Sequence, residues 1–222
     1  MKTLFFDLDG TLADSQEGII NSIHYMIQKA HLPLLSDDIY RLFIGPSLGS
    51  SLHQYYPALS ESEIDQTIQY YHEFYLEQGI FQQSLYPGIL AALAQLQAAG
   101  YQLNIASAKP EPMVDQIAER FDLNRYFTGL YGATMDERIR SSKTAVLEYA
   151  LTQSGADPNQ ALMIGDRNTD MIGGANNHVK TLGVTYGFGT ATELQAAGAD
   201  AIVASPAELP QAAAKLLTPP IS

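Results

Sequence analysis

Residues 4–11 read Leu-Phe-Phe-Asp-Leu-Asp-Gly-Thr, a short apolar run that breaks off in two carboxylates. An apolar run of this length is typical of a strand that is buried on both faces of a parallel sheet. Asp7 and Asp9 would then lie at the carboxyl end of that strand. Open α/β sheets bind their ligands at this end. We therefore expect a ligand site built around these two side chains.

The rest of the chain from Tyr86-Pro87-Gly88 onward alternates between strand and helix patterns. Helix patterns include Pro110–Phe121 and Ser142–Gln153. Strand-helix alternation indicates right-handed crossovers and a parallel sheet covered by helices. The expected strands are residues 103–106, 127–132, 161–164, 181–184 and 201–203.

The segment between these two parts has a helical pattern throughout. Asp14 with Glu17, and Ser60 with Glu63, have the spacing of capping boxes that begin helices. Apolar residues follow the first box at helical spacing, and we expect no strand here. The sequence thus predicts an α/β core domain over residues 1–13 and 85–222, interrupted by a helical domain over residues 14–84.

Composition narrows the class of function. The 222 residues carry a formal net charge of −12, 46% of them are apolar and none is cysteine. So acidic a surface repels nucleic-acid polymers and anionic membranes but tolerates a small phosphorylated ligand where local cations offset the charge. We see no signal-peptide core and no apolar run long enough to span a bilayer. We expect a cytoplasmic monomer or homodimer.

Polar residues follow several of the expected strands, so the sheet would gather them at one edge. They include the Asp7–Asp9 pair, Ser107 and the pair Asp166 and Asp170, while Lys143 opens the helix before the 161–164 strand. The stretch Asp7-Leu8-Asp9-Gly10-Thr11-Leu12 resembles the first motif of the haloacid-dehalogenase-like hydrolases. The second and third motifs of this family resemble Ser107 and Lys143, respectively. The fourth motif resembles the stretch Gly165-Asp166-Arg167-Asn168-Thr169-Asp170. The helical segment resembles the cap of the phosphoglycolate-phosphatase-like branch.

This resemblance implies a Rossmann-like core with an inserted all-helical cap, and a Mg²⁺-dependent phosphoric monoester hydrolase. Asp7 would attack phosphorus and form an aspartyl phosphate, and Asp9 would act as general acid and base. The implied Mg²⁺ ligands are the Asp7 side chain, the Asp9 backbone carbonyl and Asp166. Asp170 would contact the metal through water or contact the residues that bind the metal. The implied phosphate-binding residues are Gly10, Thr11, Ser107 and Ala108, and Lys143 would offset negative charge.

Two positions leave alternatives open. Lys109, Arg138 and Arg140 lie near enough in sequence to compete with Lys143 for its role. Arg167 is either a phosphate contact or part of a surface salt bridge. Ala108 also departs from the family pattern, in which Asn is common, although its backbone amide can still bind phosphate.

The substrate depends on the cap, which would exclude water when it closes. Arg41 and the loop 44–48, with Gly45, are the candidates for substrate contact, against the alternative of a surface Arg and a plain turn. Phosphoglycolate and nucleoside monophosphates are both compatible with this sequence as substrates. The five histidines and most cap tyrosines are expected to have structural or surface roles.

Three rival functions share the fold. A haloacid dehalogenase has no use for Asp9, so Asp9 disfavours it. A β-phosphoglucomutase-like phosphotransferase would use the same Asp7 and Asp9. A non-catalytic phosphate-binding module ranks last, because all four aspartates are present.

Overall fold

A six-stranded sheet forms the centre of the computed structural model, which describes residues 1–136 and 138–218. Its order is β5-β4-β1-β6-β7-β8, and every neighbouring pair is parallel. The predicted α/β class with a parallel sheet is therefore confirmed. The strands are β1 (Thr3–Phe6), β4 (Gln102–Pro110), β5 (Phe127–Ala133), β6 (Ala161–Gly165), β7 (Lys180–Val184) and β8 (Ala201–Val203).

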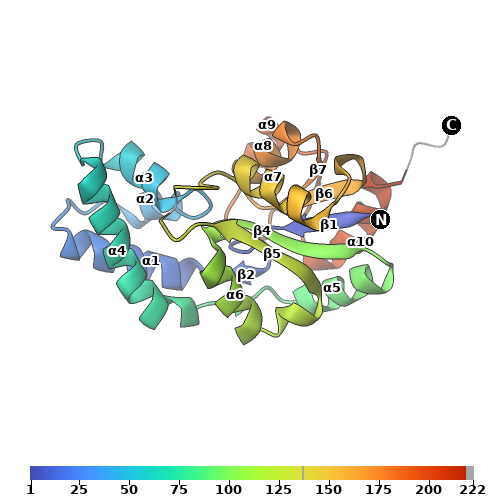
Figure 1. Cartoon of the computed structure of the whole chain (residues 1–222), viewed down its shortest axis with the longest axis horizontal. Helices are drawn as coiled ribbons and strands as arrows, with labels where there is room; N and C mark the ends of the chain where they lie inside the picture. The colour runs from blue at the N-terminus through green and yellow to red at the C-terminus, as the bar shows by residue number, and fades with distance from the viewer. Residues whose placement is uncertain (137, 219–222) are drawn as a thin grey trace.

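Strand β1 lies in the middle of the sheet and is buried on both faces, as its apolar run predicts. Leu4 and Phe6 belong to the apolar core on one face, whereas Phe5 belongs to the core on the other. This follows from the two-residue period of a strand. Figure 1 shows helices on both faces of the sheet. The helices of the Phe5 face are α7 (Lys143–Ser154) and α8 (Asn168–Asn176), and those of the Leu4 face are α5 (Ile89–Ala98), α6 (Glu111–Arg120) and α10 (Leu209–Leu216).

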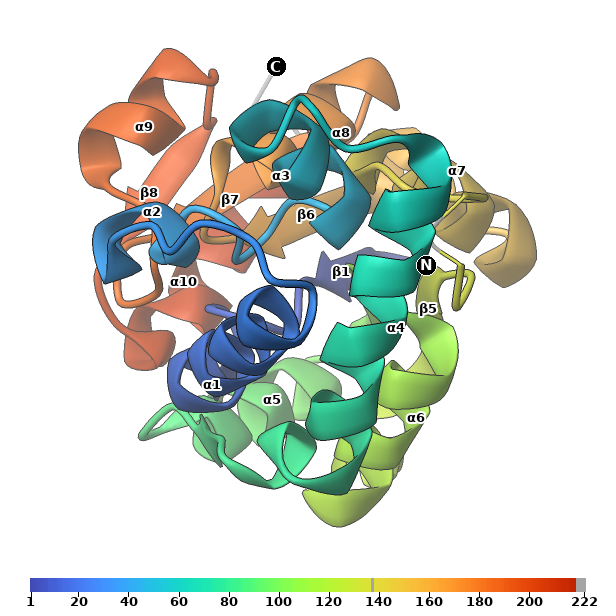
Figure 2. The same ribbon diagram turned by 90° about the vertical axis from the view of Figure 1, so that its left-hand side faces the viewer.

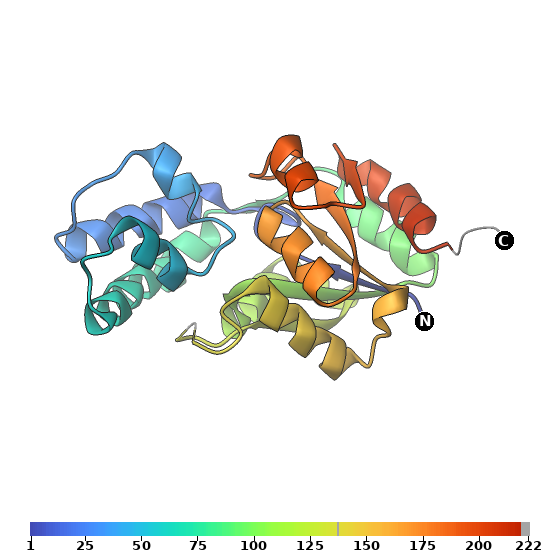
Figure 3. The same ribbon diagram turned by 90° about the horizontal axis from the view of Figure 1, so that it is seen from above.

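A second lobe, the cap, consists of helices and stands at the carboxyl end of β1 (Figures 2 and 3). Its first and last helices pack along each other. The first turn of the first helix also lies close to the turn that follows the last, because a Cβ on Gly18 would lie 2.1 Å from the carbonyl oxygen of Gly79. The helices are α1 (Gln16–Lys29), α2 (Asp37–Arg41), α3 (Leu48–Tyr55), α4 (Glu61–Glu77) and the 3₁₀ turn η1 (Gly79–Phe81).

The two chain segments that join the lobes pair with each other. Strand β2 (Ala13–Asp14) runs antiparallel to β3 (Ser84–Leu85), which the sequence analysis did not expect. The predicted capping box at Asp14 is wrong, since Asp14 lies in β2 and α1 begins only at Gln16. Pairing with β3 holds the backbone extended at Asp14. The predicted box at Ser60 is confirmed, with both reciprocal hydrogen bonds present.

The remaining elements are short and connect the larger ones. Helix α9 (Ala191–Ala196) lies beside α8 and β7. Within the described ranges, no helix is both long and apolar enough to cross a membrane.

Candidate active site

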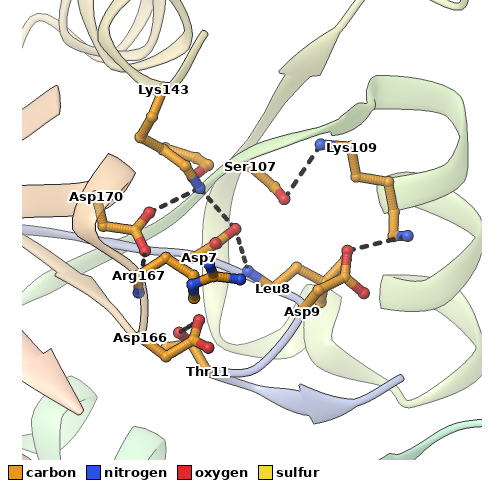
Figure 4. A network of polar contacts seen from close by, with 11 residues as sticks. Asp7, Leu8, Asp9, Thr11, Ser107, Lys109, Lys143, Asp166, Arg167 and Asp170 are labelled. Atoms are coloured by element: carbon orange, nitrogen blue, oxygen red, sulfur yellow. Dashed lines mark hydrogen bonds and ion pairs between the residues drawn. The ribbon is translucent and has the colours of Figure 1, made fainter. Parts of the chain in front are cut away.

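Six predicted site residues meet at one edge of the sheet, although they are far apart in sequence (Figure 4). Asp7 follows β1, Ser107 lies in β4 and Asp166 follows β6. The carboxyl ends of parallel strands share one edge, so the topology alone brings these three near one another. The other members come from helix starts and from the turn after β1: Lys143 in α7, Asp170 in α8, and Asp9.

Three buried carboxylates form a tight cluster. Asp7, Asp166 and Asp170 each offer one oxygen, and these atoms all lie within 4.8 Å of one another. Burial, followed by the charges of Asp170 and Asp7, raises the pKa of Asp166 well above its ordinary value. Burial raises the pKa of Asp170 to about 6, with the Lys143 charge opposing the rise. A cluster of this kind needs cations close by.

Lys143 supplies one such cation. Its Nζ lies 2.7 Å from Asp7 Oδ1 and 2.9 Å from Asp170 Oδ1, and it donates a hydrogen bond to the Ala106 carbonyl at 3.1 Å. Burial disfavours this charge, but Asp170 and Asp7 outweigh it and keep the pKa of Lys143 above its ordinary value. Of the cations weighed for this role, Lys143 is the one in contact with Asp7.

The turn after β1 fits closely around Asp166. The Thr11 hydroxyl donates to Asp166 Oδ1 at 3.3 Å, and the Phe188 amide donates to Oδ2 at 2.8 Å. Gly10 has φ +80°, and a Cβ there would lie 2.2 Å from Asp166 Oδ2. Gly10 is thus required both by its left-handed backbone and by the nearby carboxylate.

Asp9 is paired with a second lysine. Lys109 Nζ lies 3.0 Å from Asp9 Oδ2, while Asp9 Oδ1 is buried with no hydrogen-bond partner among the described residues. Although burial disfavours its charge, the Asp9 carboxylate beside it raises the pKa of Lys109 well above its ordinary value. From the sequence, Lys109 is a candidate only for the role of Lys143. Its position two residues after Ser107, at the same strand end, was the available signal.

A cavity of about 60 Å³ lies between the core and the cap. Asp7, Asp9 and Ser107 line it from the core, and the backbone segment at Ala108 belongs to the same wall. The cap contributes the loop 44–48 with Gly45, together with apolar side chains and His72. Sequence reasoning missed His72, because its spacing along α4 does not distinguish a cavity wall from a packing position.

Arg41 is not brought to this cavity. Its guanidinium pairs with Asp38 at 2.6 Å on the outside of the cap, and its side chain is about half exposed. A surface ion pair of this kind contributes little to stability.

Arg167 joins the core to the cap, and it forms an ion pair with Glu193, as the salt-bridge alternative expects, although its own side chain is largely buried. Its Nη1 donates to the carbonyl of Ile44 in the cap loop, and its Nε donates to Glu193 at 2.9 Å. Its backbone amide donates to Asp170 Oδ2 at 3.0 Å. Arg167 therefore connects the carboxylate cluster with the wall of the cavity.

The carboxylate cluster has the chemistry of a site for a hard divalent cation. Mg²⁺ prefers carboxylate and carbonyl oxygens. Among residues 1–136 and 138–218, one ammonium group contacts the three buried carboxylates, which leaves excess negative charge. Asp7, Asp166 and Asp170 are therefore the residues that could hold a metal ion.

Comparison with known proteins agrees with this arrangement. The model of the family described as haloacid dehalogenase-like hydrolase matches residues 4–184. The chain belongs to this family. Membership of this family, together with similarity to a predicted phosphatase of known structure, identifies the chain as a phosphatase-type hydrolase.

Three similar proteins can be aligned with most of this chain. A crystal structure of a predicted phosphatase from Clostridium acetobutylicum is 37% identical, with a TM-score of 0.92, over 96% of this chain and 98% of that one. A 5′-nucleotidase from Pseudomonas aeruginosa is 35% identical over 87% of this chain and 86% of its own. The tyrosine-protein kinase PtkA of Mycobacterium tuberculosis is 35% identical over 85% of this chain but 63% of its own.

Proposed function

We propose that this hydrolase releases phosphate from small phosphate monoesters, with Mg²⁺ as cofactor and Asp7 as nucleophile. One observation carries the proposal. Asp7 lies in the cavity wall with Lys143 and two further buried carboxylates behind it, and Asp9 lines the same cavity.

In the first step, an Asp7 carboxylate oxygen attacks phosphorus while the bond from phosphorus to the ester oxygen breaks. Asp9 gives its proton to the leaving oxygen. In the second step a water attacks phosphorus, Asp9 takes the proton of that water, and the bond from phosphorus to Asp7 breaks. The products are an alcohol and inorganic phosphate, and splitting the reaction in two lowers each barrier.

The other residues position the phosphoryl group and balance its charge. The Ser107 hydroxyl and the Ala108 amide would donate hydrogen bonds to phosphoryl oxygens, alongside the turn at Gly10 and Thr11. The Lys143 ammonium group pairs with Asp7 and would reduce the repulsion between this carboxylate and the dianionic ester. Mg²⁺, bound by Asp7, Asp166, the Asp9 carbonyl and Asp170 directly or through water, would supply further charge neutralisation at the phosphoryl group.

The second candidate is transfer of the phosphoryl group to an acceptor other than water. The similarity to a protein named as a tyrosine kinase favours testing it. A mutase-type transfer to a sugar would use the same Asp7 and Asp9. Hydrolysis ranks first because similar proteins of known structure are named phosphatases and because water needs no acceptor subsite of its own.

Phosphate release from purified protein tests the proposal. The panel contains p-nitrophenyl phosphate, phosphoglycolate, nucleoside monophosphates and sugar phosphates, each with Mg²⁺ and with excess chelator. We expect Mg²⁺-dependent release, abolished by Asp7→Asn and unchanged by Asp122→Asn, an exposed carboxylate outside the site. Phosphate appearing on an added hydroxyl acceptor instead of in solution would favour transfer.

A further inference from the structure

A short loop that the hydrolytic steps do not use lies against the carboxylate cluster. It consists of residues 186–189, Tyr-Gly-Phe-Gly, shortly after β7, and we call it the strap. Strands β6 and β7 are parallel neighbours, so the strap and Asp166, which follows β6, lie at the same edge of the sheet. The strap lies outside the four motifs from which the site was predicted.

The strap holds the side chain of Asp166 through a backbone amide. The Phe188 amide donates a hydrogen bond to Asp166 Oδ2 at 2.8 Å, and the Thr11 hydroxyl donates to Oδ1 at 3.3 Å. The Asp166 side chain is fully buried. With one donor on each oxygen, the carboxylate cannot rotate without breaking both hydrogen bonds.

Two glycines allow the strap to approach so closely. A Cβ on Gly187 would lie 2.1 Å from the carbonyl oxygen of Gly10 and 2.6 Å from Asp166 Cβ. A Cβ on Gly189 would lie 1.8 Å from the carbonyl oxygen of Asp166. The atoms in the way belong to the backbone or to the first side-chain carbon, so they cannot move aside as the end of a flexible side chain could. A side chain at either glycine would therefore displace the strap from Asp166.

Tyr186 connects the strap to the turn after β1. Its hydroxyl donates to the carbonyl of Thr11 at 3.1 Å, and its ring packs edge-on against Tyr86 with the ring centres 5.0 Å apart. Tyr86 follows β3 in the link between the lobes. Both donors to Asp166 thus depend on the strap, because it contains Phe188 and holds Thr11 through Tyr186.

A fixed carboxylate matters more for Mg²⁺ than for Ca²⁺. Mg²⁺ demands near-ideal octahedral geometry with short metal–oxygen distances, whereas Ca²⁺ accepts more oxygens in a flexible arrangement at longer distances. Contacts that orient a metal ligand typically change metal affinity by about 10- to 100-fold when they are lost. A carboxylate that is free to reorient should therefore lose more affinity for Mg²⁺ than for Ca²⁺.

We propose that the strap makes the carboxylate cluster selective for Mg²⁺ over Ca²⁺, by fixing the orientation of Asp166. The Phe188 amide and the Tyr186 hydroxyl act as positioning groups and do not touch the substrate. The proposal rests on the proposed function, since it takes the carboxylate cluster as the Mg²⁺ site.

Calorimetric titration of the metal-free full chain with Mg²⁺ and with Ca²⁺ tests the proposal without substrate. Tyr186→Phe keeps the ring and removes only the hydroxyl. We expect it to weaken Mg²⁺ binding about 10-fold and Ca²⁺ binding less than about threefold. Gly187→Ala displaces the strap itself and should weaken Mg²⁺ binding by up to about 100-fold, again with a smaller effect on Ca²⁺. Tyr186→Phe keeps the test decisive if Gly187→Ala does not fold.

Two matched substitutions outside the strap serve as controls. Tyr126→Phe removes a hydroxyl beside Arg125, and Gly49→Ala adds a Cβ that meets Ile68 at an ordinary contact distance of 3.8 Å. Both should keep the wild-type ratio of the Mg²⁺ and Ca²⁺ dissociation constants. Both ions are measured on one sample of each variant, so an inactive fraction does not alter the comparison.

Urea unfolding in excess chelator separates positioning from stability. A strap that only stabilises the fold would make Tyr186→Phe less stable while leaving the ratio of the two dissociation constants unchanged, and that result would overturn the proposal. Equal losses of affinity for both ions would overturn it as well. Mg²⁺-dependent phosphate release with an unshifted ratio sinks the strap alone, whereas a shifted ratio without release from any ester sinks the hydrolysis alone. Failure of the wild type to bind either ion would refute both the metal site and the strap.

Discussion

Lys143 illustrates how single residues hold this site together. Its ammonium group is buried between the carboxylates of Asp7 and Asp170. Removing one partner of a buried ionic group leaves uncompensated charge, which costs more than the loss of a surface pair. The contact between Lys143 and the proposed nucleophile Asp7 should therefore also stabilise the folded chain.

Lys143→Met should lower the free energy of unfolding by about 3 to 5 kcal/mol in the absence of divalent metal. The methionine keeps most of the side-chain volume, so the effect reports the lost charge. Urea unfolding monitored by circular dichroism measures it. The exposed Lys215→Met serves as control and should change the value by less than about 0.5 kcal/mol. A stable Lys143→Met protein would mean that Asp7 and Asp170 do not depend on this lysine.

His72 makes the folded state sensitive to acid. Its pKa is lowered to about 4 in the folded state by burial and by Lys109, whereas an unfolded histidine titrates near 6.5. Between these values the unfolded chain binds more protons, so stability falls as the pH drops from about 6.5 towards 4. His72→Gln should remove roughly 2 to 3 kcal/mol of this loss.

Unfolding measured at pH 7 and at pH 4.5 for both proteins tests the effect of His72. His53→Gln is the matched control, because His53 is exposed on the same lobe and should not alter the pH dependence of the buried site. If wild type and His72→Gln lose stability equally on acidification, then His72 is not held neutral by burial.

At the residue scale, the sequence was informative wherever a functional group follows a strand. Asp7, Ser107 and Asp166 could be placed together because strand ends in a parallel sheet share one edge. Lys109 could have been placed with them from its position two residues after Ser107, whereas His72 could not, since its position depends on how α4 of the cap packs on the core, and no local pattern encodes that packing. The outward orientation of Arg41 likewise follows from its pairing with Asp38.

At the scale of elements, the link between lobes is the feature that sequence periodicity missed. The helical pattern of residues 14–84 was correct for α1 to α4, but the pairing of β2 with β3 involves residues about seventy positions apart. Two-residue strands carry too little pattern to be recognised. The same limit applies to Arg167, whose cap partner Ile44 is 123 residues away.

Arg167→Met should weaken cap closure while leaving the nucleophile in place. The buried hydrogen bonds to Ile44 and Glu193 would be lost, although the backbone bond to Asp170 remains. We expect kcat/KM to fall about 10- to 100-fold, chiefly through a higher KM, because substrate binding requires a closed cavity wall.

Steady-state kinetics on the preferred ester measure the effect of Arg167, and Arg138→Met is the matched control. Arg138 also joins the core to the cap, through an ion pair of 2.5 Å with Asp65, but the Arg138 side chain is largely exposed and that of Asp65 is partly exposed. Its loss should change kcat/KM by less than about threefold. Equal effects of the two substitutions would show that Arg167 has no special part in closure.

At the scale of the whole molecule, the site lies where two lobes meet and is assembled from both. The core supplies the carboxylates and lysines, and the cap supplies much of the cavity wall. Fold class was readable from strand-helix alternation, whereas the size and lining of the cavity depend on how the cap sits on the sheet. The excess negative charge of the Asp7, Asp166 and Asp170 cluster also arises only in the folded chain, because folding brings these three carboxylates together.

Mg²⁺ should therefore raise the melting temperature. At a concentration about 100-fold above its dissociation constant, a ligand of the folded state contributes about 2.7 kcal/mol. For a chain of this size that is a rise of roughly 5 to 10 °C. Scanning calorimetry with Mg²⁺ and with chelator measures it, with Asp122→Asn behaving as wild type. The same rise in Asp166→Asn would exclude Asp166 as a ligand.

The most direct test of the central claim is to trap the phosphoryl group on Asp7. The protein is mixed with substrate and Mg²⁺, quenched, treated with borohydride and analysed by peptide mass spectrometry. Borohydride reduces an aspartyl phosphate to homoserine. We predict homoserine at position 7, dependent on both substrate and Mg²⁺ and absent from Asp7→Asn. Phosphate release in the same sample with an unmodified Asp7, or with the modification on another carboxylate, would contradict the mechanism.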